Sequence, residues 1–254
     1  MKLSNKLMAM LLSFVLVVSM LASCEDPVEQ PLQTDNYIAN VEIKFATNDD
    51  AMKAAVDAMN SSKSTVYVSG DEMRIETLAS LNDIMLADNY IFFLGNLYHE
   101  QKLTVGEDTM ANYEMASVGE ADREKLLADI GAGASIDVED FEISNKEGQD
   151  GNISYNCKNI KADARESLQA IYASNFSAFK ATVELSGAEF RLETENGRDK
   201  SSILSCHFVI NMDGQTYEIT MHITTTYDYD TVFGISAPVN VDEYVKVNYD
   251  EMFK

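Results

Sequence analysis

Two histidines on one predicted strand face are the residues whose type and spacing come closest to a metal site. Asp213-Gly214 predicts a tight hairpin turn, because such a turn needs positive φ at both central residues. This register makes His207 and His222 diagonal neighbours on a polar face, with Cβ atoms about 7 Å apart, and Glu218 shares that face. The alternative is a pair of solvated side chains. We favour it and expect no metal, because no H-x-x-x-H or HExxH spacing is present.

The other candidate groups point away from catalysis. Cys157 and Cys206 both fall at apolar-face positions, where they form either a disulfide or two small buried hydrophobes, and the sequence leaves both open. We interpret His99 as structural. The chain lacks CxxC, G-x-S-x-G, P-loop and G-x-G-x-x-G motifs, and acids are too frequent for any pair to indicate a glycosidase. We expect no catalytic residues, no cofactor and no enzymatic activity.

The third cysteine, Cys24, lies where a bacterial lipid anchor would. The uncharged run Leu7–Leu21 follows two lysines and is shorter than the ~20 residues of a membrane-spanning helix. The quartet Leu21-Ala22-Ser23-Cys24 resembles the lipobox of bacterial lipoproteins. That resemblance implies that residues 1–23 are a signal peptide and that Cys24 carries a lipid with palmitate-type acyl chains. The mature protein would then lie in the cell envelope, anchored on the extracytoplasmic side of a membrane. The alternative is an ordinary secreted protein that is cleaved near this point.

The charge of the chain excludes several partners. The 254 residues carry a net charge of −23. Removing the two lysines of the signal from the 19 basic residues leaves 17 against 42 acidic ones, a net charge of −25. Such a surface repels phosphate, so we expect no nucleic acid partner. It also repels anionic lipid headgroups, so membrane attachment depends on the lipid, in which each buried methylene contributes ~0.8 kcal/mol.

The chain divides into a tether and one domain. Residues 24–36 are acidic and contain two prolines without an apolar period, which is typical of a tether, and residues 37–254 are long enough for one domain with a sizeable core. Turn signals stand at Gly70-Asp71, Asp88-Asn89 and Gly95-Asn96. Apolar periodicity predicts strands at 37–46, 73–77 and 153–157, a helix after Thr47, a second helix at about 119–130 and a third from Ala162.

The clearest pattern is the hairpin around Asp213-Gly214. One of its faces is almost wholly apolar and the other mostly polar, which predicts an antiparallel sheet with one covered face. The apolar face consists of Leu204, Cys206, Phe208, Ile210, Met212, Tyr217, Ile219, Met221 and Ile223.

The order of elements, the stretch HFVINMDGQTYEITMHITTTYDYD and the ending FGISAPVNVDEYVKV resemble the lipoprotein-carrier superfamily typified by LolA and LppX, and its uncharacterised lipoprotein relatives. The matching residues of the ending are Gly234, Ile235, Pro238, Asp242 and Tyr244. The resemblance implies an α+β fold, a curved antiparallel half-open β-barrel whose concave face is closed by helices around an apolar cavity.

The carriers hold acyl chains in that cavity, so the expected function is to bind a hydrophobic ligand such as a lipid. The candidate lining residues come from the apolar face of the hairpin: Phe208, Ile210, Tyr217, Ile219 and Met221. The alternative is an envelope interaction or sensor module in which the protein's own side chains fill this space. A continuous apolar void of about 300 Å³ or more would favour the carrier, and a packed core would favour the module.

Overall fold

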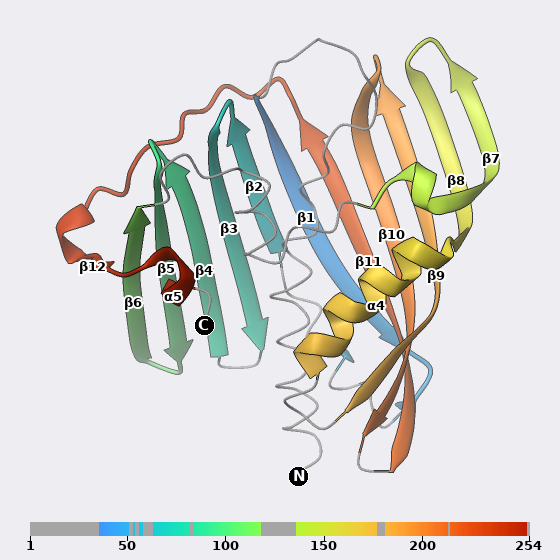
Figure 1. Cartoon of the computed structure of the whole chain (residues 1–254), viewed down its shortest axis with the longest axis horizontal. Helices are drawn as coiled ribbons and strands as arrows, with labels where there is room; N and C mark the ends of the chain where they lie inside the picture. Colours follow the sequence, from blue (N-terminus) through green and yellow to red (C-terminus); the bar gives the residue numbers. More distant parts are fainter. Residues whose placement is uncertain are drawn as a thin grey trace.

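A single open sheet of twelve strands organises the protein (Figure 1), in the order β12-β6-β5-β4-β3-β2-β1-β11-β10-β9-β8-β7. The computed structural model describes residues 36–50, 53, 56–57, 63–81, 84–117, 136–176, 181–212 and 214–252. All neighbouring strands are antiparallel except β12, which runs parallel to β6. The strand that comes first in the sequence, β1, lies in the middle of the sheet between β2 and β11, so it joins two meanders side by side.

The strands are long and are mostly connected by tight turns. Leu94 and Gly95, which connect β4 to β5, both have positive φ, as does Gly70 between β2 and β3. The strands are β1 (Asn36–Thr47), β2 (Lys63–Ser69), β3 (Glu72–Leu81), β4 (Ile84–Phe93), β5 (Asn96–Val105), β6 (Asp108–Ser117), β7 (Phe141–Gln149), β8 (Asn152–Ile160), β9 (Thr182–Glu195), β10 (Arg198–Met212), β11 (Gln215–Asp228) and β12 (Val245–Lys246). The helices whose bounds lie within the described residues are α4 (Ala162–Phe176), α5 (Tyr249–Met252) and the 3-10 turns η1 (Val138–Asp140) and η3 (Val241–Glu243).

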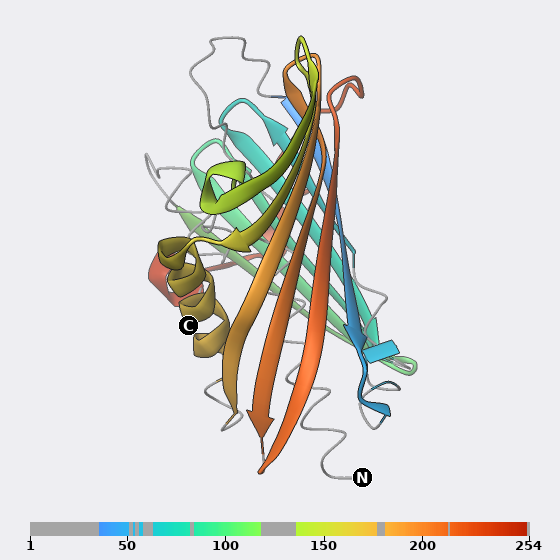
Figure 2. The same ribbon diagram turned by 90° about the vertical axis from the view of Figure 1, so that its right-hand side faces the viewer.

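One face of the sheet carries most of the core. Alternate side chains of β1, β9, β10 and β11 pack together there with Leu168 of α4 and Val138 of η1. All nine apolar hairpin residues predicted from the sequence are buried in this cluster. Helices α4, η1 and α5 lie on this same side of the sheet (Figure 2). Burying an aliphatic or aromatic side chain of this size contributes about 1.5–3 kcal/mol.

Helix α4 covers the open edge of β9, a strand that has no strand neighbour on one side over part of its length. Strand β8 pairs with β9 only over residues 190–193, so the first half of β9 has an open edge on that side. The side-chain amide of Gln169 fills this place: its Nε2 donates to the Val183 carbonyl, and the Leu185 N–H donates to its Oε1 at 2.5 Å. The amide therefore satisfies one backbone acceptor and one backbone donor, as a neighbouring strand would.

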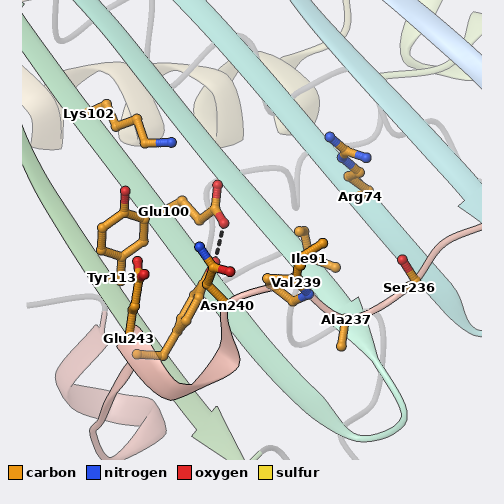
Figure 3. A pocket seen from close by; sticks show the side chains of 12 residues that line it. Arg74, Ile91, Glu100, Lys102, Tyr113, Ser236, Ala237, Val239, Asn240 and Glu243 are labelled. Atoms are coloured by element: carbon orange, nitrogen blue, oxygen red, sulfur yellow. Dashed lines mark hydrogen bonds between the residues drawn. The ribbon is translucent and has the colours of Figure 1, made fainter.

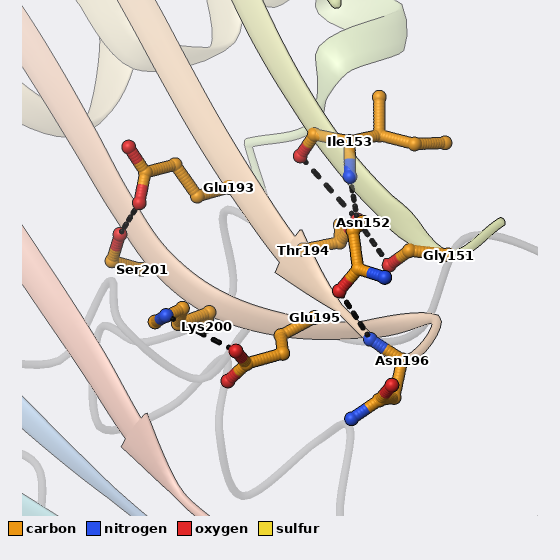
Figure 4. A network of polar contacts seen from close by, with 9 residues as sticks. All are labelled: Gly151, Asn152, Ile153, Glu193, Thr194, Glu195, Asn196, Lys200 and Ser201. Carbon is orange, nitrogen blue, oxygen red and sulfur yellow. Dashed lines mark hydrogen bonds and ion pairs between the residues drawn. The ribbon is translucent and has the colours of Figure 1, made fainter. Parts of the chain in front are cut away.

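The tips of two hairpins are tied together where β8 begins and β9 ends (Figure 4). The Thr194 hydroxyl donates to the Gly151 carbonyl at 3.0 Å, and the Ile153 N–H donates to the same hydroxyl at 3.0 Å. The Gly197 N–H also donates to Gly151 O at 2.9 Å. Gly151 has a φ of +80°, and a Cβ there would lie 2.6 Å from the Gly197 nitrogen, so this close approach requires glycine.

The C-terminal segment wraps around one end of the sheet. We call residues 231–247 the strap. The strap crosses the face opposite the main core, where Ile235 and Tyr244 pack against Ile91 and Tyr98. Its last part pairs with the edge of β6 as β12, and Met252 of α5 then reaches the cluster on the first face. The strap therefore packs on one face of the half of the sheet formed by β2–β6, and α5 packs on the other face.

The predicted α+β half-open barrel with helices closing its concave face is wrong. The described residues form an open sheet whose ends, β7 and β12, lie far apart (Figure 1), and α4 packs beside β9 without closing a cavity. The physical reason is the pairing of β1 with both β2 and β11, which places the two meanders next to each other in one layer. The sequence stretches that extend this sheet, residues 96–117 and 141–149, had not been assigned as strands.

Most predictions of single strands, helices and turns are confirmed. The strands at 37–46, 73–77 and 153–157 and the helix from Ala162 are confirmed. The hairpin register is confirmed throughout, from Met212 opposite Gln215 outward. The predicted turn at Asp88-Asn89 is wrong, because both residues lie within β4.

Some predictions fall outside the described residues or are only partly covered by them. After Thr47, residues 50, 53, 56 and 57 are helical, and the Asp49 N–H donates to the Thr47 hydroxyl at 3.1 Å. Asp213, Cys24 with the signal and most of the tether, and the helix predicted at 119–130 lie outside the described residues. Among the helices that the structure describes, none has the length and apolar character to span a bilayer.

Candidate functional site

The five predicted cavity-lining residues do come together, but on a filled face. Phe208 and Ile210 on β10 lie beside Tyr217, Ile219 and Met221 on β11, and all five are almost completely buried. They share one cluster with residues of β1, β9 and α4. None of them lines the strap-side pocket of about 340 Å³ or the hollow of about 250 Å³ described below. The hairpin face that the sequence marked as a candidate cavity lining is therefore part of the hydrophobic core cluster.

The two histidines of the opposite hairpin face each contact a hydroxyl. His222 Nδ1 lies 2.8 Å from Ser205 Oγ, and His207 Nδ1 lies 3.1 Å from Thr220 Oγ1. Burial lowers the pKa of His222, and the nearby His207 lowers it further. A hollow of about 250 Å³ lies beside His222. The described residues contain no group of three or more potential ligands placed to hold a metal ion, and the absence of metal from this face stays a prediction.

Both described cysteines are free and buried. Of the two possibilities that the sequence left open, the structure therefore has the pair of buried thiols. Burial raises the pKa of the Cys206 thiol to about 12, so this thiol stays protonated at neutral pH and is a poor nucleophile. Burial also raises the pKa of Cys157, which Asp137 raises further. Neither thiol is activated for chemistry.

A pocket of about 340 Å³ opens between the strap and the outer face of β3–β6 (Figure 3). We call it the strap pocket. Charged side chains of β3 and β5, Arg74, Glu100 and Lys102, point into it, and the strap closes its opposite side. The lining residues are Arg74, Ile91, Glu100, Lys102, Tyr113, Ser236, Ala237, Pro238, Val239, Asn240, Glu243 and Tyr244.

Tyr244 anchors the strap over this pocket. Its hydroxyl donates to Glu100 Oε1, and its ring packs edge-on against Tyr98 and tilted against Tyr113, with centroids 5.5 Å away in both cases. Burial raises the pKa of Tyr244, and the Glu100 carboxylate raises it further, so the phenol stays neutral and remains a donor. The same hydrogen bond fixes the position of Glu100 in the pocket.

The strap pocket brings two cations, Arg74 and Lys102, together with two carboxylates, Glu100 and Glu243. Lys102 Nζ lies 5.6 Å from the centroid of the Tyr113 ring, a cation–π contact. The guanidinium of Arg74 forms an ion pair with Glu76 and lies 5.8 Å from the centre of the Tyr67 ring. Together with Asn240, these cations can donate hydrogen bonds to a ligand, while Glu100 and Glu243 can accept them. Such an arrangement can bind and orient a small polar ligand.

A buried polar pair on the core face was missed by the sequence analysis. Asp88 on β4 and His99 on β5 lie among apolar side chains, and His99 Nε2 is 2.7 Å from Asp88 Oδ1. The ring of Tyr90 stacks on the imidazole with centroids 4.4 Å apart. The sequence analysis interpreted His99 as a structural residue and named no partner for it. The structure shows that His99 is buried and paired with Asp88. Asp88 stands two residues from both Leu86 and Tyr90, and this spacing along a strand could have shown that it faces inward with them.

The comparisons with known proteins supply no family. No protein-family model and no curated protein matches the chain. Among solved structures, one match is an inactive mutant of the CurJ dehydratase in complex with a compound, 9% identical over 87% of this chain and 82% of that one, with a TM-score of 0.13. Another is the dehydratase domain of the polyketide PpsC from Mycobacterium tuberculosis, 11% identical over 86% and 82%, with a TM-score of 0.12. Scores this low carry no argument about fold or activity.

Proposed function

We propose that this protein is a lipid-anchored lipoprotein of the bacterial cell envelope whose folded domain is a non-enzymatic binding module. Of the two functions that the sequence analysis kept open, the filled core favours the interaction or sensor module over the carrier of acyl chains. The strap pocket is where its ligand binds. The observation that carries the proposal is the convergence of donors and acceptors in this pocket, while the apolar face of the hairpin is packed.

The strap pocket suits a ligand that both donates and accepts hydrogen bonds. Lys102 and Arg74 lie toward different ends of the pocket, with Glu100 between them (Figure 3). A polar group of the ligand can therefore meet a cation and a carboxylate at once, and its apolar part can contact Pro238 and Ile91. The volume of about 340 Å³ lies near the lower end of the range for small-molecule sites, about 300–1,000 Å³.

The predicted lipid anchor on Cys24 determines where in the cell the domain lies. A lipid on Cys24 would hold the domain near a membrane surface from which its own charge repels it. The tether of residues 24–36 reaches about 40 Å when fully extended, so the strap pocket can face soluble molecules beside the membrane. The lipid anchor and the envelope location rest on the sequence.

Native mass spectrometry of the full chain, extracted from host membranes in mild detergent, tests the proposal. We expect a bound mass that is lost when Lys102→Ala and Glu100→Gln are combined. The matched control is Lys44→Ala, which removes an exposed cation of another strand whose partner is Glu42, and it should keep the bound mass. A bound fatty acid that persists in both variants would overturn the strap pocket as the site and restore the acyl-chain carrier. A wild-type chain that carries no bound mass would also count against the proposal.

A further inference from the structure

The imidazole of His99 is buried and is contacted by both a carboxylate and an aromatic ring. Only 7% of the residue is exposed, and Asp88, 4% exposed, binds its Nε2 at 2.7 Å. The Tyr90 ring lies parallel to it within 3°. In the tautomer that carries its N–H on Nε2, this N–H donates to the carboxylate and Nδ1 is left with a lone pair whose direction is fixed by the rest of the site.

Nδ1 of His99 is a buried polar atom with no hydrogen-bond partner. The closest charged group is Glu114 on β6, whose Oε2 lies 3.7 Å away. This distance is too long for a hydrogen bond, which spans about 2.7–3.2 Å. A buried polar atom that lacks a partner costs about 1–3 kcal/mol, so a rigidly presented one calls for a ligand.

We infer that His99 Nδ1 and Glu114 Oε2 bind a divalent transition-metal ion, of which Zn²⁺ is the best match. A zinc ion holds an imidazole nitrogen at about 2.0–2.1 Å and a carboxylate oxygen at about 2.0–2.2 Å, and tetrahedral angles then separate the two ligand atoms by about 3.4 Å. The observed 3.7 Å is 0.3 Å longer. The side chain of Glu114 is 26% exposed, so a small rotation closes the gap and an ion can arrive from solvent.

Asp88 completes the pattern expected around such an ion. A metal-binding histidine usually donates its other N–H to a carboxylate, which fixes the tautomer and raises the basicity of the ligating nitrogen. Imidazole with carboxylate suits Zn²⁺, Cu²⁺ or Ni²⁺ better than Ca²⁺, which takes oxygen ligands. The described residues contain no group of three or more candidate ligands, so they supply two ligands here and water can take the remaining positions.

The ion would also reinforce the end of the sheet that the strap holds. Glu114 lies opposite Val245 in the short parallel pairing of β6 with β12. A bond from the Glu114 side chain to an ion fixed on β5 would tie β6 to its neighbour beside that pairing. Since the ion binds the folded state, Zn²⁺ should raise the melting temperature.

Calorimetric titration of the full chain in detergent with Zn²⁺, after removal of metals by a chelator, tests the inference. We expect one Zn²⁺ per chain. His99→Gln and Glu114→Gln should each abolish or strongly weaken binding, and Asp88→Asn should weaken it about 10–100-fold. Titration with Ca²⁺ should show no binding that depends on His99.

Two controls keep the result interpretable. The variant in which His207 and His222 are both Ala removes the other two histidines and should bind Zn²⁺ as the wild type does. Melting curves separate lost binding from lost folding, and the partly exposed Glu114 gives a variant that should fold even if His99→Gln does not. A wild-type chain without Zn²⁺ binding would overturn the inference and leave His99 as a structural group. The inference would also be overturned if Zn²⁺ binding were kept in Glu114→Gln but lost in the variant in which His207 and His222 are both Ala.

Discussion

Substitution of Ile219 by Phe tests whether the apolar hairpin face is core or cavity. Ile219 on β11 is 2% exposed and lies opposite Phe208 on β10 and Thr47 on β1. Because this space is filled, the larger ring must displace its neighbours, which costs about 1–3 kcal/mol. In a domain of roughly this size each kcal/mol shifts the melting temperature by about 2–4 °C, so the melt should fall by about 2–12 °C.

The assay is a pair of measurements on wild type and variant: thermal unfolding followed by circular dichroism, and titration with a fluorescent fatty acid. We expect no saturable binding by the wild type and a lowered melt in the variant. Val209→Phe is the matched control, since it adds a ring at the neighbouring position on the uncovered face and should change stability by less than about 0.5 kcal/mol. Fatty acid binding by the wild type, lost in Ile219→Phe without a change in melt, would refute the filled-core reasoning.

Four further changes test the local arguments. Gln169→Leu leaves one backbone acceptor and one donor of β9 unsatisfied, so it should cost about 2–6 kcal/mol at about 1–3 kcal/mol each, measured by denaturant unfolding. Cys24→Ala should leave an unprocessed precursor without lipid on immunoblots and in peptide mass spectra. Changing His207 and His222 together to Ala should shift the free energy of unfolding by less than about 1 kcal/mol, because we expect neither to be a metal ligand. Cys206 should resist alkylation at pH 8 in the native protein, because burial raises its pKa to about 12, and should react once the chain is unfolded.

The hairpin shows which parts of a fold a sequence can reveal. The register from Met212 and Gln215 outward depends on a turn of two residues and on strict alternation along both strands, and all of this information lies within about twenty consecutive residues. The same holds for α4, whose place in the chain was predicted from the apolar residues Ala164 and Leu168, four positions apart. Such elements are predictable because neighbouring residues determine them.

Asp88 shows why a local signal can fail. Asp-Asn is a common turn sequence, but Asp88 lies within β4 because its carboxylate finds His99 eleven residues later on β5. The pairing of β4 with β5 supplies a partner for the charge inside the core, which turn propensity does not take into account. The candidate metal site, which adds Glu114 of β6, was hidden for the same reason.

The sequence singled out only a few of the residues that line the strap pocket, and it gave no sign that they form a pocket. Pro238 and Tyr244 stood out in the ending that resembles the lipoprotein carriers, and both line the pocket. Arg74 and Lys102 gave no signal, because they lie on strands that the chain visits separately and meet only through the sheet order. The juxtaposition of these cations with the strap is a property of the folded molecule.

The sequence by itself determined the features that depend on neighbouring residues: the acidic charge, the lipobox-like Cys24, the alternating faces of the hairpin and the start of α4. Only the tertiary structure decided that the strands form one open layer, that the predicted cavity face is core, and that the strap encloses a polar pocket. The physical reason is that strand order depends on contacts between distant segments. The pairing of β1 with β11 joins residues nearly two hundred positions apart, and no local pattern encodes that choice.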